Sequence, residues 1–242
     1  MLRPMLVFAV MLALGGCATT KDSANKPGSD TAAGDAEGWQ ATFVVDKRSL
    51  KPTGEGAYMS LVPGSQWAYR GEDVVLTITV LNETRLVDGV TTRVVEEREE
   101  EDGKLKEVSR NFMAIDPATG DVYYFGEEVD IYKNGKITGH EGAWMSGVNG
   151  ARFGLLVPGR PDVGARFHQE VAPGVAMDRA EVASVDEQVT TPAGVYAHCL
   201  HIVETTPLEK GKSHKWFAPG VGLVKDDEEA LVSSRRVGSG GR

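Results

Sequence analysis

Two histidines and a cysteine within four positions, His198, Cys199 and His201, have the clearest chemical potential in this sequence. Alternate side chains of a strand share one face, so Cys199 and His201 would point one way and His198 the other. A thiolate and an imidazole at this spacing could supply half of a copper or zinc site. A buried cysteine beside partly exposed histidines would give the same pattern, and no second thiolate or third histidine follows in register.

Carboxylates and histidines near a glycine-rich stretch form a second candidate. His168, Glu170 and Glu141 lie close to residues 139–164 and could hold a cation or a polar ligand at the mouth of that stretch. Solvated charges at strand ends would look the same. The metal-binding alternative therefore rests on Cys199, His201, His168, Glu170 and Glu141.

Aromatic residues offer a third possibility, a ligand pocket on the concave face of a curved sheet. The candidates are Trp67, Tyr123, Phe125, Trp144, Phe167 and Trp216. The same residues could be ordinary core. If they line a pocket, we expect aromatic walls and no convergent cluster of titratable groups.

Signatures of catalysis are missing from the sequence. It contains no nucleophile elbow, P-loop, dinucleotide fingerprint or metalloprotease helix. We therefore expect no enzyme activity and no cofactor. The net charge of −9 would repel phosphate backbones, so nucleic acid is not an expected partner either.

The elements that must position these residues are predicted to be antiparallel strands. Alternating apolar and polar runs at 73–85, 90–99, 105–115 and 121–132 are separated by the turn sequences Asp88-Gly89, Asp102-Gly103, 116–120 and Asn134-Gly135. Further strands are predicted at 166–171, 180–190, 195–204, 214–217 and 222–225. Residues 139–164 are interpreted as a long glycine-rich crossover or lid loop, and the acidic run 96–102 as an exposed hairpin tip. The fold class is all-β, a curved antiparallel meander or open barrel.

The N-terminus has the pattern of an export signal. Arg3 precedes an apolar run from Met5 to Leu14, which is too short to cross a bilayer as a helix. Leu14-Gly15-Gly16-Cys17 resembles the bacterial lipobox; an ordinary secretory signal with a chance cysteine is the alternative. The resemblance implies cleavage between Gly16 and Cys17, lipidation of Cys17, and membrane attachment through its acyl chains. Ala18 resembles the default signal for sorting to the outer membrane, where the protein would face the periplasm.

Three stretches, taken in their order along the chain, are similar to motifs of the TapB-like family of exported bacterial proteins. They are residues 61–69 (LVPGSQWAY), 191–196 (TPAGVY) and 216–224 (WFAPGVGLV). The resemblance covers roughly residues 58–225 and implies a curved antiparallel sheet in the cell envelope. It carries over no catalytic residue.

The domain organisation follows from these patterns. Residues 1–16 are predicted to be the signal peptide and 17–38, which lack large apolar side chains, a lipidated flexible tether. Residues 39–230 form a single β-rich domain, and 231–242 a flexible tail. We expect a non-enzymatic envelope lipoprotein that binds an apolar or amphipathic ligand, or a partner protein in the envelope.

Overall fold

The computed structural model describes residues 38–235, and in that range the chain forms strands and turns without a helix. The predicted signal peptide, Cys17 and almost all of the predicted tether lie outside the described residues. Within the described part, no helix has the length and hydrophobicity that a membrane crossing would need.

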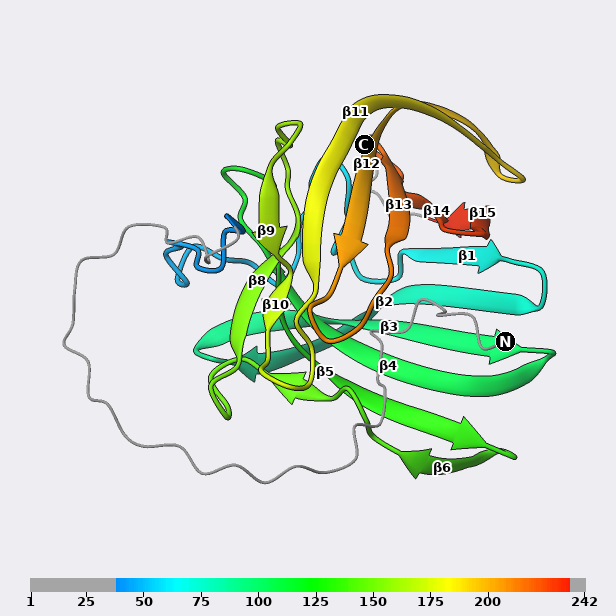
Figure 1. The fold of residues 1–242 in the computed structure, drawn as a ribbon, viewed down its shortest axis with the longest axis horizontal. Helices are drawn as coiled ribbons and strands as arrows, with labels where there is room; N and C mark the ends of the chain where they lie inside the picture. Colours follow the sequence, from blue (N-terminus) through cyan, green and yellow to red (C-terminus); the bar gives the residue numbers. More distant parts are fainter. Residues whose placement is uncertain (1–37, 236–242) are drawn as a thin grey trace.

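The strands form one 15-stranded antiparallel sheet that curls into a nearly closed barrel (Figure 1). Their bounds are β1 (Gln66–Arg70), β2 (Val74–Val87), β3 (Val90–Glu101), β4 (Lys104–Ile115), β5 (Val122–Lys133), β6 (Lys136–Gly139), β7 (Trp144–Met145), β8 (Arg152–Val157), β9 (Arg166–His168), β10 (Glu170–Val171), β11 (Arg179–Thr191), β12 (Gly194–Thr205), β13 (Ser213–Ala218), β14 (Gly222–Asp226) and β15 (Glu229–Arg235). The order across the sheet is β10-β8-β5-β4-β3-β2-β1-β15-β14-β13-β12-β11-β9, while β6 and β7 also pair with β5. The all-β prediction is confirmed.

The meander from β2 to β6 follows the predicted turns. Asp88, Asp102 and Asn134, each followed by glycine, have φ values of 48°, 52° and 54°. Positive φ at both central residues is what a two-residue hairpin loop of type I′ requires, and Asp-Gly and Asn-Gly tolerate it best. These local signals fix the pairing of β2 with β3, β3 with β4, and β5 with β6.

One seam interrupts the barrel, between β9 and β10. The two strands are consecutive in the chain and are separated only by Gln169, yet β9 pairs with β11 and β10 pairs with β8. The peptide chain itself therefore joins the two ends of the sheet. Gln40 pairs with the free edge of β9, donating to the Arg166 carbonyl oxygen and accepting from the His168 amide.

Two predicted boundaries are wrong. The glycine-rich stretch is not only a crossover loop, because β7 and β8 lie inside it and add strands to the sheet edge beside β5. Glycines and a missing alternation conceal such short strands from a sequence pattern. The flexible tail predicted from residue 231 is wrong for residues 231–235, which belong to β15 and pair with β1.

The core is divided between the two faces of the sheet. The larger cluster lies in the barrel interior and includes Tyr69, Tyr124 and Leu231. The smaller cluster lies on the outer face of β3, β4 and β5, where Leu50 from the N-terminal segment belongs to the same cluster as Phe112 and Phe43 packs on Tyr123. Covering both faces of these central strands explains why their pattern becomes continuously apolar in places.

Candidate ligand site in the barrel interior

The barrel interior is incompletely filled. A hollow of about 80 Å³, partly open to solvent, lies between strands β1 to β4, β8 and β12 to β14, and we call it the interior hollow. Its apolar wall includes Trp67, Ile78, Val80, Val95, Met113 and Leu156. Concave, mainly apolar spaces with a few polar groups are typical of small-molecule sites.

The first strand holds one wall of the interior hollow in place. The Trp67 indole Nε1–H donates to the Val221 carbonyl oxygen at 2.9 Å, and the Tyr69 hydroxyl donates to the Leu223 carbonyl oxygen at 2.9 Å. Both bonds reach past β15 to the β13–β14 connection and β14. They satisfy the polar ends of two buried aromatic rings and keep their apolar faces against the space.

A buried ion pair lies at the polar base of the hollow. Lys215 Nζ is 2.5 Å from Glu204 Oε2, and both side chains are almost inaccessible. Gln169, from the seam, donates its side-chain N–H to Glu204 Oε1 at 2.7 Å. The charge of Glu204 is therefore balanced and both of its oxygens are occupied. Removing one member of such a pair commonly costs about 3–5 kcal/mol.

Asp226 is the unusual member of this cluster. Its side chain is 0% exposed, it lines the interior hollow, and neither carboxylate oxygen has a hydrogen-bond partner among the described residues. Burial raises the pKa of Asp226 well above its ordinary value, while Lys215 opposes the rise and Glu204 adds to it. A buried acceptor without a donor costs about 1–3 kcal/mol.

Acidic residues continue along the inner face of β3 and β4. Glu97 lines the hollow, Glu99 is only 8% exposed, and Glu99 lies opposite Glu107 in the β3–β4 register. The interpretation of residues 96–102 as an exposed tip is therefore wrong for these inward positions. Strand alternation directs Glu97 and Glu99 inward, whereas Glu96 and Glu100 face outward and pair with Arg110 and Arg98.

Burial and mutual repulsion raise the pKa values of these inner carboxylates. Burial raises the pKa of Glu97 to about 6, with Lys215 opposing. Burial and the neighbouring Glu101, Glu229 and Glu97 raise the pKa of Glu99 to about 7. Burial together with Glu99 and Glu97 raises the pKa of Glu107 to about 8. The expectation of a pocket without convergent titratable groups is wrong.

The predicted pocket aromatics separate into different places. Trp67 lines the interior hollow, and Trp144 lines a second hollow of about 290 Å³ beside Glu127. Tyr123 and Phe125 pack in the outer core with Phe153, and Phe167 packs in the main core. Trp216 stacks on His201, with ring centroids 4.6 Å apart.

Cys199 and His201 have separate partners. Cys199 is fully buried in the main core, and its thiol contacts the Tyr196 carbonyl oxygen at 3.6 Å. His201 Nδ1 is 2.8 Å from Glu187 Oε1, and its Nε2 is 2.9 Å from His214 Nδ1. His198 has a φ of 55° at a bend in the long β11–β12 hairpin. That bend breaks the regular alternation on which the predicted pairing depended.

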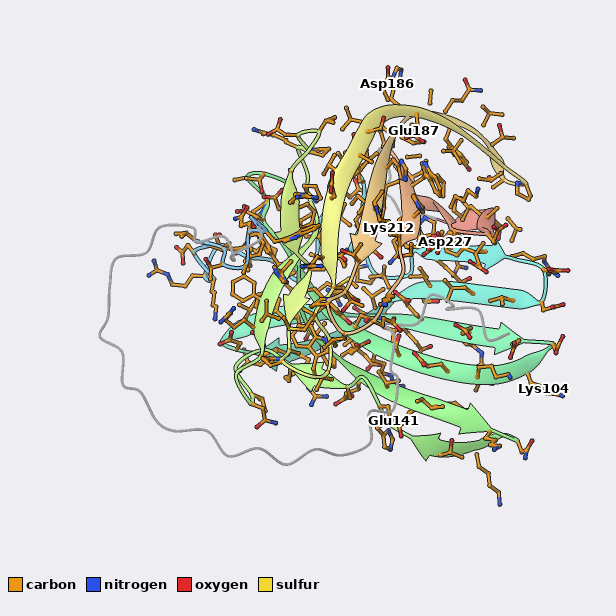
Figure 2. All side chains as sticks on the ribbon, viewed as in Figure 1. Lys104, Glu141, Asp186, Glu187, Lys212 and Asp227 are labelled. Atoms are coloured by element: carbon orange, nitrogen blue, oxygen red, sulfur yellow. The ribbon has the colours of Figure 1, made fainter. Side chains whose placement is uncertain are left out.

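The remaining predicted metal ligands do not assemble either. His168 and Glu170 are buried beside the seam, where Glu170 Oε1 accepts the Asp178 amide at 2.5 Å. Glu141 is exposed, and Figure 2 shows it on the opposite side of the molecule from Glu187. Among residues 38–235, no three histidine, cysteine, aspartate or glutamate side chains are grouped to hold a metal ion.

The residues at the base of the hollow were missed by sequence reasoning. Asp226, Val224 and Gly222 occupy every second position of β14 and therefore share one face. Lys215 and Phe217 share a face of β13 in the same way, so each charged residue lies beside apolar ones. This placement at every second position, in line with apolar residues, is the signal that could have identified them as inward-facing. Nothing local indicates that these strands and β12 curl around the same space.

The comparisons with known proteins add no relative. The chain matches no protein-family model, and neither curated proteins nor solved structures gave a match.

Proposed function

We propose that this chain is a non-enzymatic cell-envelope lipoprotein, anchored through acyl chains on Cys17, whose barrel interior binds an apolar or amphipathic ligand. The lipobox-like Leu14-Gly15-Gly16-Cys17 supports the anchor, and the resemblance to TapB-like exported proteins agrees with an envelope location, the outer membrane facing the periplasm. The observation that carries the binding function is the apolar interior hollow, because a well-packed interior of this size would leave no such space.

The anchor predicts acylation at one cysteine. In the native host or a bacterial host that processes lipoproteins, the wild-type chain should incorporate labelled palmitate, and Cys17→Ser should lose the label completely. Cys199→Ser is the matched control, since Cys199 is the only other cysteine and lies in the core. Mass spectrometry should place the mature N-terminus at Cys17. Unlabelled wild-type protein free in the medium would contradict the anchor.

The binding function predicts a ligand that is displaced when the hollow is filled. Native mass spectrometry of host-made protein should show an additional bound mass, and Ile78→Trp, which adds volume to the wall, should lower its occupancy at least tenfold. Leu86→Trp is the control, because Leu86 is 72% exposed. Equal occupancy in both variants would show that the ligand binds elsewhere. Co-purification of a protein, with no small molecule, would favour the partner-protein alternative.

A further inference from the structure

The charges at the base of the interior hollow are unbalanced. Glu204 and Lys215 form an ion pair at 2.5 Å, and Gln169 occupies the second oxygen of Glu204. Asp226 and Glu97 line the same space. Lys215 is committed to Glu204, and burial raises the pKa of Asp226 and opposes its ionisation, so the excess of negative charge at neutral pH comes from Glu97, whose pKa is about 6. An anionic head group would meet repulsion here, whereas a cation would be attracted.

The base of the hollow also offers hydrogen-bond acceptors without matching donors, which again favours a ligand that donates. Asp226, an inner residue of β14 that lines the hollow, has two buried carboxyl oxygens without a hydrogen-bond partner among the described residues, and both become acceptors when the group is ionised. Carboxylates accept hydrogen bonds most strongly from charged N–H donors. A ligand that brings such a donor would remove the cost of the unsatisfied acceptor, and an ether or ester oxygen would not.

The apolar wall of the interior hollow determines which chemical groups the rest of the ligand can have. Trp67, Ile78, Val80, Val95 and Met113 present apolar atoms to the hollow. Their contacts suit an aliphatic chain, because burial of each methylene is worth about 0.8 kcal/mol. The site therefore combines an apolar wall with an acceptor at its base.

We propose that the interior hollow binds an amphipathic molecule with a primary ammonium head group, which donates hydrogen bonds to Asp226 while its aliphatic chain lies against Trp67 and Val95. This inference rests on the proposed ligand-binding function and specifies the class of ligand. Lys215, Glu204 and Glu97 face the same head-group position, and Asp227 and Glu229 lie near Asp226 along the chain. Binding should ionise Asp226 and release a proton, which calorimetry in buffers of different protonation enthalpy would detect.

The test compares decylamine, decanol and decanoate by titration calorimetry. The protein is the chain from residue 17 onward with Cys17→Ser, which needs no detergent. Decylamine should bind at least tenfold more tightly than decanol, and decanoate more weakly than either. Asp226→Asn should remove about tenfold of the decylamine affinity and leave decanol unchanged, whereas the exposed Glu228→Gln should change neither.

A second comparison uses the protein without a substitution at Asp226. Decyltrimethylammonium is cationic but donates no hydrogen bond, so it should bind at least tenfold more weakly than decylamine. Equal affinities would overturn the role assigned to Asp226. Tighter binding of decanoate or decanol would overturn the ammonium preference and leave the proposed function standing. Failure of every probe to bind would overturn the inference and count against the proposed function as well.

Discussion

The free energy of unfolding is expected to fall by about 3 kcal/mol between about pH 4.5 and pH 8 from Glu99 alone. Burial and the surrounding carboxylates raise the pKa of Glu99 to about 7 in the folded chain, whereas its ordinary value is 4.5. Between these values the folded state binds more protons than the unfolded state. Raising the pH therefore favours unfolding, and Glu107, with a pKa of about 8, adds to the same trend.

The trend should reverse in stronger acid. Burial opposes ionisation of Asp88, but hydrogen bonds from Lys47 and Ser146 outweigh it and hold the pKa below its ordinary value. Such a group stabilises the fold when ionised and loses that contribution as the pH falls through its folded pKa. Maximum stability is therefore expected in mildly acidic solution.

Urea denaturation across this pH range measures the effect. Glu99→Gln should flatten the profile by roughly 2–3 kcal/mol, because the amide stays neutral at every pH. Glu100→Gln is the control on the outward face of the same strand, where Glu100 pairs with Arg98. A stability that rises steadily from pH 5 to pH 8, or the same flattening in both variants, would contradict the inward placement of the acidic face.

Closing the seam should depend on the absence of a side chain at Gly154. A Cβ atom at this position in β8 would collide with the backbone carbonyl oxygens of His168 and Gln169. These are the residues at which the chain passes from β9 to β10, and backbone atoms cannot rotate away as a side chain can. Gly154→Ala should therefore cost roughly 3 kcal/mol of stability, at the upper end for overpacking.

Gly139→Ala is a suitable control for that substitution. The three atoms nearest to its Cβ would all belong to the carboxylate of Glu141, an exposed and flexible side chain that can move aside. Denaturation midpoints and amide hydrogen exchange along β8 to β10 would measure both variants. Wild-type stability and protection in Gly154→Ala would show that β8 does not lie against the seam as described.

The comparison of sequence and structure is clearest along β3. Alternation correctly predicts a strand here, and Asp102-Gly103 correctly predicts the hairpin that follows it. The same alternation contains the information that Glu97 and Glu99 share a face with Val95. Acidic residues are nevertheless almost never buried without a partner, so a run of them predicts an exposed segment, and the burial of the inward face was missed. Only the curvature that encloses β3 reveals the burial of these carboxylates.

The sequence by itself predicted most of the longer strands, the tight turns between them and the antiparallel meander, because each of these depends on residues close together in the chain. Tertiary structure decided which strands meet at the seam, which aromatic rings belong to which core, and that Lys215, Glu204 and Asp226 converge. Glu204, Lys215 and Asp226 come from β12, β13 and β14, while the wall they share comes from β1 to β4 and β8. Their meeting depends on closing the sheet around a common interior, and no local pattern of residues records where a sheet closes.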